Sequence, residues 1–275
     1  MKPSLLRKTG THLALMLLAG LVLLPFLYVL LISFGQGVVG IGAAVPEAFT
    51  ADNYRRLFSE TLYLQWLSNS LVISLVTALA ALVLVSVSVY VFSRLRFAGK
   101  EHLFQGLLLI QVFPLTLSMV SLFKLFVALG LINRMESLML VNTVLSSAGL
   151  ILMAKGYFDT IPIELDEAAA MDGAGRLTIL RRILLPLAKP MLTVVALQSF
   201  VLSYNEYVIA SAVMNQGLGA IPLAVGLQSM IQGQFGTNWA LYCAGAVVGS
   251  LPMLALFYAL QKYFVGGLTD GSVKS

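Results

Sequence analysis

Cysteine and histidine are almost absent from this sequence, which contains one cysteine, Cys243, and two histidines, His12 and His102. A single cysteine excludes an intramolecular disulfide and a cysteine-based metal site. Each histidine lies at the end of an apolar run near basic residues, with no nucleophile partner or metal-ligand spacing around it. The sequence therefore indicates neither an intramembrane enzyme nor a metal-binding protein, and it predicts no catalytic residue.

Charged residues are also scarce, at 11% of the 275 residues, whereas 59% are hydrophobic and the mean hydropathy is +0.92. Soluble domains are roughly half apolar, and a helix needs about 20 apolar residues to cross the ~30 Å hydrocarbon core of a bilayer. We therefore predict an all-α integral membrane protein, with residues 1–275 forming one transmembrane domain. Six apolar runs predict about six transmembrane helices: Leu13–Phe34, Leu67–Phe92, Leu103–Leu129, Ser137–Ala154, Met191–Met214 and Trp239–Phe264.

The first apolar run follows basic residues, as a secretory signal does, but it differs from one in length. It continues for about 20 residues, against 7–15 for a signal, and it contains Pro25 and no evident cleavage site. We therefore predict a retained helix.

Basic residues outnumber acidic ones, 17 to 12, and the pI is about 9.4. They are distributed among alternate connections between the apolar runs and do not form one patch. With the N-terminus inside, most of them are cytoplasmic, the exceptions being Arg55, Arg56, Lys124 and Arg134. This is the positive-inside pattern, so we predict cytoplasmic termini, contact with membrane lipid and no nucleic-acid partner.

One cytoplasmic connection, Glu164–Pro190 within a segment of about 162–190, carries four acidic and four basic side chains. Pro162 and the acidic residues after it favour a helix start, and Asp172-Gly173 favours a helix end with a positive φ. A second helix is predicted from about Arg176 to Pro186, giving a helix-turn-helix. Three consecutive alanines at 168–170 present a small-residue surface. The pattern fits a docking surface for another protein, and it also fits a solvated connector.

The connection Asn215–Asn238, an external loop of about 214–238, contains five glycines and no charged residue. It is longer than a simple connection requires, and such loops are often functional. It is not expected to be helical throughout. A loop lying on the bilayer surface is the alternative.

Glu206, next to Asn205, is the only acidic residue inside an apolar run. Burying it costs about 2.5–3.5 kcal/mol or more unless it is paired or hydrated, so we expect it to face the interior of the helix bundle. Lys124 is a possible partner. Asn205 and Glu206 are candidates for a hydrated translocation path or for a polar contact between helices. Milder polar residues within the runs are Asn69, Gln111 and Gln198.

A longer pattern in the charged segment carries a resemblance to a known family. It consists of Glu167-Ala168-Ala169, then Gly173, then Ile183-x-Leu185-Pro186. This resembles the EAA loop of permease subunits in binding-protein-dependent ABC importers. Further stretches are similar to maltose-type, MalG-like permeases: "PFLYVLLISF", "QVFPLTLSMVSLF", "YNEYVIASAVM", "PLAVGLQ" and "QKYFVGGLTDGSVKS".

This resemblance implies a transport subunit, not an enzyme, in a bacterial or archaeal cytoplasmic (inner) membrane. Its implied partners are a second, MalF-like permease, two ATPase (MalK-like) subunits and an extracytoplasmic sugar-binding protein. The sequence has no G-x-x-x-x-G-K-[ST] phosphate loop, so ATP and Mg would be bound by the partner subunits and this chain would hold no cofactor.

The resemblance also implies three groups of contact residues. Those coupling to the ATPase are Glu167, Ala168, Ala169, Gly173, Ile183, Leu185 and Pro186. Those facing the sugar-binding protein are Gln216, Gly217, Gly219 and Gln232. A cytoplasmic tail of about 265–275, too polar and glycine-rich to fold alone, would reach the ATPase through Gly267, Leu268, Thr269 and Lys274, although a frayed terminus is the alternative.

The competing function is an ion-coupled secondary transporter. Such a protein needs coupling-ion carboxylates or a broken-helix repeat near the bilayer midplane. One intramembrane glutamate and no visible repeat favour the importer. The sequence does not fix which maltose- or maltodextrin-like oligosaccharide is carried.

Overall fold

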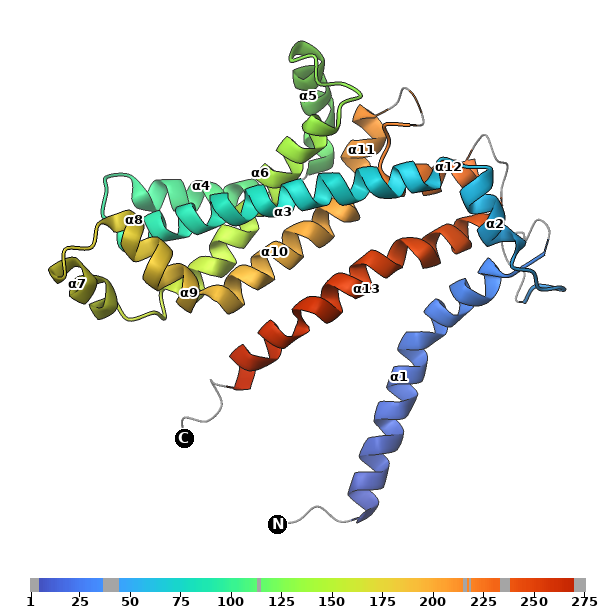
Figure 1. Ribbon diagram of the computed structural model, residues 1–275, viewed down its shortest axis with the longest axis horizontal. Coiled ribbons are helices and arrows are strands. Elements are labelled where there is room, and N and C mark those ends of the chain that lie inside the picture. The colour runs from blue at the N-terminus through green and yellow to red at the C-terminus, as the bar shows by residue number, and fades with distance from the viewer. Residues whose placement is uncertain are drawn as a thin grey trace. The chain divides into compact units, whose positions relative to one another are not determined.

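A computed structural model describes residues 5–36, 45–112, 115–214, 217, 219–232 and 238–269 (Figure 1). These residues are predominantly helical, and their only β-type pairing is one isolated bridge between Gly35 and Phe49. The predicted all-α class is confirmed. The chain divides into two compact units, Met1–Tyr63 with Gly226–Leu251, and Leu64–Val225 with Pro252–Ser275.

The described residues form the following helices. In chain order they are α1 (Leu5–Ser33), α2 (Asp52–Ser59), α3 (Tyr63–Arg94), α4 (Lys100–Val112), α5 (Leu115–Ala128), α6 (Met135–Phe158), α7 (Glu164–Met171), α8 (Arg176–Ile179), the π-helical turn η1 (Leu180–Leu184), α9 (Leu185–Leu187), α10 (Lys189–Tyr204), α11 (Val208–Val213), α12 (Leu223–Gln232) and α13 (Trp239–Thr269).

The first unit is organised around the short helix α2. The buried Asn53 side chain donates hydrogen bonds to the carbonyl oxygens of Ser33 and Gly35, at 3.0 and 2.8 Å. The Tyr63 hydroxyl donates to the carbonyl oxygen of Gly245 at 2.7 Å. The Asn53 bonds satisfy backbone carbonyl groups at the end of α1, and the Tyr63 bond joins the start of α3 to α13.

In the second unit, α6 packs against α10 and α4 (Figure 1). Its main apolar core combines Val85 and Val89 of α3 with Leu150, Ile151, Ala154 and Phe158 of α6. The connection that follows α6 shares this core, because its buried residues belong to the same cluster. They are Ile161, Ile179, Leu180, Leu184 and Ala188.

Within the part of the chain that the structure describes, four helices are long and apolar enough to cross a membrane: α1 from Gly10, α3, α6 and α13 to Gln261. A fifth span results if Arg176–Leu187 and Lys189–Tyr204, which meet at an angle of 82°, are taken together. Large apolar side chains on these helices are exposed, for example Leu17 at 67% and Val83 at 65%. Such surfaces suit hydrocarbon and not water.

Two of the predicted runs are not single helices. The third comprises α4 and α5, on either side of residues 113–114, which lie outside the described residues. The fifth, Met191–Met214, was wrong as one helix, because α10 ends at Tyr204 and α11 begins at Val208. The count of six transmembrane helices therefore stays a prediction.

Candidate functional site

The helix α7 begins and ends where the charged segment predicts. Glu164, Asp166 and Glu167 occupy its first turn, where the helix dipole favours negative charge. At the other end Gly173 has φ +82°, and the amides of Gly173 and Ala174 donate to the carbonyl oxygens of Ala170 and Ala169, each at 3.0 Å. This pair of bonds around a left-handed residue is a Schellman motif. The predicted positive φ at Gly173 is confirmed.

The second helix of the segment is less regular than predicted. It begins at Arg176, but it passes through the π-helical turn η1 before α9. Pro186 lies at the start of α9 and does not end the helix; the 82° change of direction falls at Ala188, between α9 and α10. A proline lacks the N–H that an α-helix needs at an interior position, and the π turn just before it accommodates that loss.

Asp166 and Ala169 are the two residues of α7 that are partly buried against the rest of the chain. Asp166 forms an ion pair with Arg94 at the end of α3, with Nε to Oδ2 at 2.5 Å and side-chain exposures of 14% and 8%. Arg94 also donates from Nη2 to the carbonyl oxygen of Ile161 at 2.8 Å. Charges this deeply buried persist only when paired, so α7 is fastened to α3. Sequence reasoning missed this contact, because nothing in one sequence relates residues so far apart.

The other residues of α7 are turned outward. Glu164, Glu167, Ala168, Ala170 and Met171 are exposed, Met171 at 89%. The expectation of one surface from three alanines was wrong, because Ala169 is half-buried against the core of its own chain. Helical geometry is the reason, since three consecutive residues point in three different directions.

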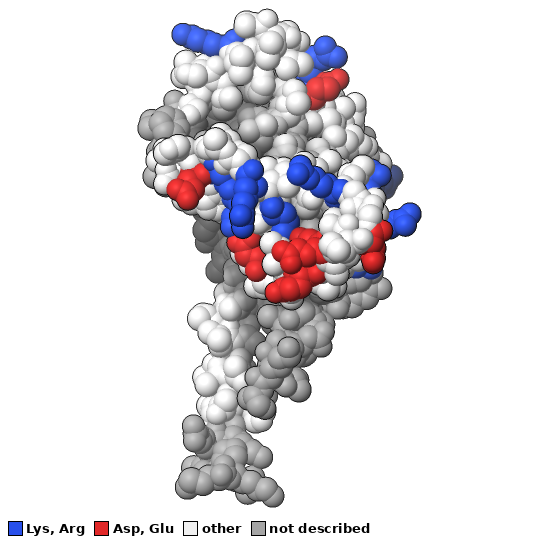
Figure 2. All heavy atoms as spheres, turned by 90° about the vertical axis from the view of Figure 1, so that its left-hand side faces the viewer, with Lys and Arg blue, Asp and Glu red and all other residues white. Residues whose placement is uncertain are grey.

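The second half of the EAA pattern lies partly inward. Leu185 packs against the apolar core, Ile183 is half-buried and Pro186 is exposed. Figure 2 views the face that carries α7 and α8, where acidic side chains gather beside basic ones. The outward surface of α7 is therefore both acidic and apolar.

Glu206 acts within its own segment. Its carboxylate accepts hydrogen bonds from the amides of Ile209, at 2.6 Å, and Ala210, at 2.9 Å. The first N–H groups of a helix have no partner within it, so the glutamate supports the start of α11 after a break that hydropathy did not reveal. Among the described residues, no ion pair joins it to Lys124, so the suggested partner was wrong. The side chain of Asn205 is exposed and donates to the Val201 carbonyl oxygen at 3.0 Å.

The loop before α12 is attached to α3. Asn69 donates from Nδ2 to the carbonyl oxygens of Gly219, at 2.8 Å, and Ile221, at 3.0 Å. The hydroxyl of Ser70 accepts the amide of Leu223 at 2.7 Å and so caps α12. The polar character of Asn69 within an apolar run was the available sequence signal, while Ser70 gave none.

The candidate residues of that loop lie in different surroundings. Gly217 has φ +82° and is exposed, Gly219 is half-buried, and Gln232 is exposed at the end of α12. Gln216 lies outside the described residues. As expected, the loop is not helical throughout, since α12 occupies only Leu223–Gln232.

The end of the chain is more helical than predicted. Helix α13 continues to Thr269, so Gly267, Leu268 and Thr269 are helical and were wrongly placed in an unfolded tail. The apolar run before them extends the helix past the glycines. Lys274 lies outside the described residues.

The comparisons with known proteins agree over nearly the whole chain. The family described as "Binding-protein-dependent transport system inner membrane component" matches residues 100–269. The chain is 39% identical to the maltodextrin transport system permease protein MdxG of Bacillus subtilis, over 98% of this chain and 97% of that one. It is 34% identical to the maltose/maltodextrin transport system permease protein MalG of Escherichia coli K12, over 96% and 95% of the two chains.

The fold is also found in a solved structure. A chain of a bacterial ABC transporter involved in the import of the acidic polysaccharide alginate superposes with a TM-score of 0.76, covering 94% of this chain and 97% of that one, at 23% identity. The sequence relatives are transport permeases, which favours the ABC importer over an ion-coupled transporter and over an enzyme. This chain belongs to the family of inner membrane components of binding-protein-dependent transport systems.

Proposed function

We propose that this chain is one of two permease subunits of an ATP-driven importer for maltodextrin-like oligosaccharides. It forms half of the translocation pathway beside a second, MalF-like permease, in six transmembrane helices with both termini in the cytoplasm. Two MalK-like subunits bind ATP and Mg, and an extracytoplasmic protein delivers the sugar. The relatives MdxG and MalG are maltodextrin and maltose/maltodextrin permease proteins, and GanQ of Bacillus subtilis, 37% identical to this chain, is a galactooligosaccharides permease protein; these relatives support an oligosaccharide as the cargo.

The observation that carries this proposal is the two-sided construction of α7. Its outward side presents Glu167, Ala168 and Met171, free to enter a cleft of an ATPase subunit. Its inward side is held by the Arg94–Asp166 ion pair and by Ala169 against the core. A segment held in this way passes on a rigid-body movement, which a loose connector would absorb.

The core of the second unit gives that movement a path into the membrane helices. Ile179, Leu180 and Leu184, which follow α7, pack in one cluster with residues of α3, α6 and α10. Close-packed interiors transmit displacement with little compression. A push on α7 by the closing ATPase dimer therefore reaches three helices.

The helix α3 extends this path toward the proposed external side. Arg94 holds the α7 segment at one end, and Asn69 and Ser70 hold the start of α12 near the other. The two attachment points lie about 36 Å apart at 1.5 Å per helical residue. We propose that the loop with Gln216, Gly217, Gly219 and Gln232 contacts the sugar-binding protein, and that residues 267–274 contact the ATPase.

The proposal is tested by reconstituting the chain with its partner permease, ATPase subunits and sugar-binding protein in lipid. Maltodextrins should raise the rate of ATP hydrolysis, and the effect should require the binding protein. A galactooligosaccharide serves as the comparison sugar, because GanQ is among the relatives. Uptake driven by an ion gradient without ATP, or hydrolysis that no oligosaccharide stimulates, contradicts the proposal.

A further inference from the structure

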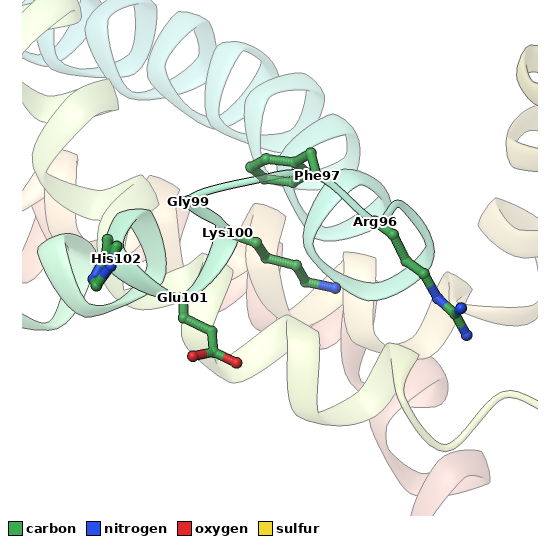
Figure 3. A pocket seen from close by; sticks show the side chains of 6 residues that line it. All are labelled: Arg96, Phe97, Gly99, Lys100, Glu101 and His102. Atoms are coloured by element: carbon green, nitrogen blue, oxygen red, sulfur yellow. The ribbon is translucent and has the colours of Figure 1, made fainter.

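The turn between α3 and α4 contains a surface hollow that the proposed transport function does not use. Its volume is about 340 Å³, and its lining residues are Arg96, Phe97, Gly99, Lys100, Glu101 and His102 (Figure 3). Figure 3 shows the Lys100 side chain extending beneath Phe97 on the side where Arg96 lies, with Glu101 below them. Arg96 and Lys100, both positively charged, therefore line the same hollow.

A second hollow of about 270 Å³ adjoins the first and shares Lys100 and Glu101 with it. Its remaining lining residues are Phe92, Phe104, Gln105 and Lys155. The Phe92 ring lies 5.7 Å from that of Phe104 and 6.3 Å from that of Phe97, between centroids. The Lys155 ammonium lies 5.5 Å from the centre of the Phe104 ring. The two hollows together are therefore lined by lysine ammonium groups and by phenylalanine rings.

The cations of this site retain capacity for a ligand. Lys100 donates one hydrogen bond to the carbonyl oxygen of Leu95 at 3.2 Å, which leaves two of its three donors. Lys155 is paired with Asp159 at 2.5 Å. Arg96 has no ion pair or hydrogen bond among the residues that the structure describes. Glu101 also lines both hollows, and its negatively charged carboxylate disfavours the binding of an anion there.

Exposed apolar side chains occur on α4 beyond the hollows and on α3. Leu103, Leu108 and Leu109 are exposed at 59%, 46% and 71%. Val87 of α3 is exposed at 49%. Beside a cationic hollow at the end of a predicted membrane span, exposed apolar side chains can contact acyl chains, which a free phosphate ion does not have.

We propose that these hollows bind the phosphate headgroup of an anionic phospholipid. Arg96 and Lys100 contact the phosphate, Phe92, Phe97 and Phe104 contact the glycerol region, and the acyl chains lie along the leucines of α4. The bound lipid then fixes the α3–α4 turn at the membrane surface. No residue of this site belongs to α7, and lipid binding is measured separately from ATPase coupling, so the failure of one proposal is distinguishable from the failure of the other.

The test uses the assembled importer in detergent, with short-chain phosphatidylglycerol as the probe and native mass spectrometry as the readout of bound lipid. Each juxtamembrane cation contributes on the order of 1 kcal/mol, so Arg96→Gln and Lys100→Gln should each weaken binding by about fivefold. Arg96→Lys and Lys100→Arg retain the charge and should retain binding. Arg55→Gln, the same change at an exposed residue of α2, is the matched control and should leave binding unchanged.

Glu101→Gln gives a test of opposite sign. Removing the repelling carboxylate should tighten phosphatidylglycerol binding by about fivefold, a result that misfolding does not produce. Phosphatidylcholine, which has no net charge, should bind weakly to every variant. Equal binding of the two lipids, no response to Arg96→Gln and Lys100→Gln, or complete displacement of the lipid by inorganic phosphate would each overturn the proposal.

Discussion

Gly173 sets the direction in which the chain leaves α7. Its φ of +82° is accessible to glycine at little cost, whereas a side chain there costs about 1–2 kcal/mol. No atom lies within 4 Å of the position that a Cβ would take, so the strain comes from the backbone alone. Gly173→Ala should therefore weaken co-purification of the ATPase with the two permeases.

Gly175 provides a matched control for that experiment. It also has open space around its missing Cβ, but its φ is −72°, a value that alanine adopts without strain. Gly175→Ala should leave ATPase association unchanged. If the two variants behave alike, the backbone conformation at Gly173 is not what orients α7.

Glu206 is expected to contribute to stability and not to bind sugar. Its two carboxylate oxygens accept amides of Ile209 and Ala210 at the start of α11. Glu206→Gln retains one acceptor and places an N–H₂ group against the other amide, which should cost about 1–2 kcal/mol. The thermal unfolding midpoint of the purified importer should fall, and Asn205→Ser should leave it nearly unchanged. A lowered sugar affinity at unchanged stability would contradict this assignment.

These residues differ in how far the sequence could predict them. Gly173 was predictable, because a glycine after a short helix with an acidic first turn has few other roles. The function of Glu206 was not, because hydropathy averages over about 20 residues and cannot place a break of three. The ion pair between Arg94 and Asp166 depends on how α3 and α7 meet in space, which no local pattern encodes.

At the scale of elements, the attachment of α7 to α3 is the contact most sensitive to mutation. Removing one partner of a buried ion pair leaves an uncompensated charge, at a cost of about 3–5 kcal/mol. Arg94→Met and Asp166→Leu should each lower the thermal unfolding midpoint, and the double variant should be less damaged than the sum of the two. That coupling is measured by a double-mutant cycle on the purified importer.

The Lys155–Asp159 pair is the control for this cycle. It is more exposed, with side-chain exposures of 24% and 44%, and it joins residues one helical turn apart. Exposed pairs of this kind contribute about 0.3–0.5 kcal/mol, so Asp159→Asn should have little effect. Additive effects of Arg94→Met and Asp166→Leu would show that the buried pair does not fasten α7.

Long, uninterrupted helices were easier to predict from the sequence than interrupted ones. Helices α3, α6 and α13 follow long apolar runs and lie close to the predicted bounds. The third and fifth runs were predicted as single helices, because composition records hydrophobicity and not helix continuity. The short α12 lies within the loop that was not expected to be helical throughout, and α2 lies in the connection between the first two apolar runs.

At the scale of the whole molecule, the orientation in the membrane is predicted from the distribution of basic residues. Single cysteines in a Cys243→Ser background report it by labelling with a membrane-impermeant reagent. Cysteines at Arg96 and Arg176 should react only from the cytoplasm, and one at Gln232 only from outside, because all three positions are exposed in the chain. Reaction of Arg96 and Gln232 from the same side would contradict the proposed topology.

The central claim is that the outward face of α7 couples the ATPase to the membrane helices. The most direct measurement is sugar-stimulated ATP hydrolysis by the reconstituted importer carrying Glu167→Lys. The control is Glu47→Lys, the same charge reversal at an exposed acid between the first two apolar runs, where Arg55 and Arg56 are also predicted to lie outside. The Glu167→Lys variant should still pair with the second permease, but the stimulation of its ATP hydrolysis by sugar should fall by roughly tenfold or more. The Glu47→Lys variant should retain its association with the ATPase. Wild-type stimulation of Glu167→Lys would contradict the account, and the charged segment would then be a solvated connector.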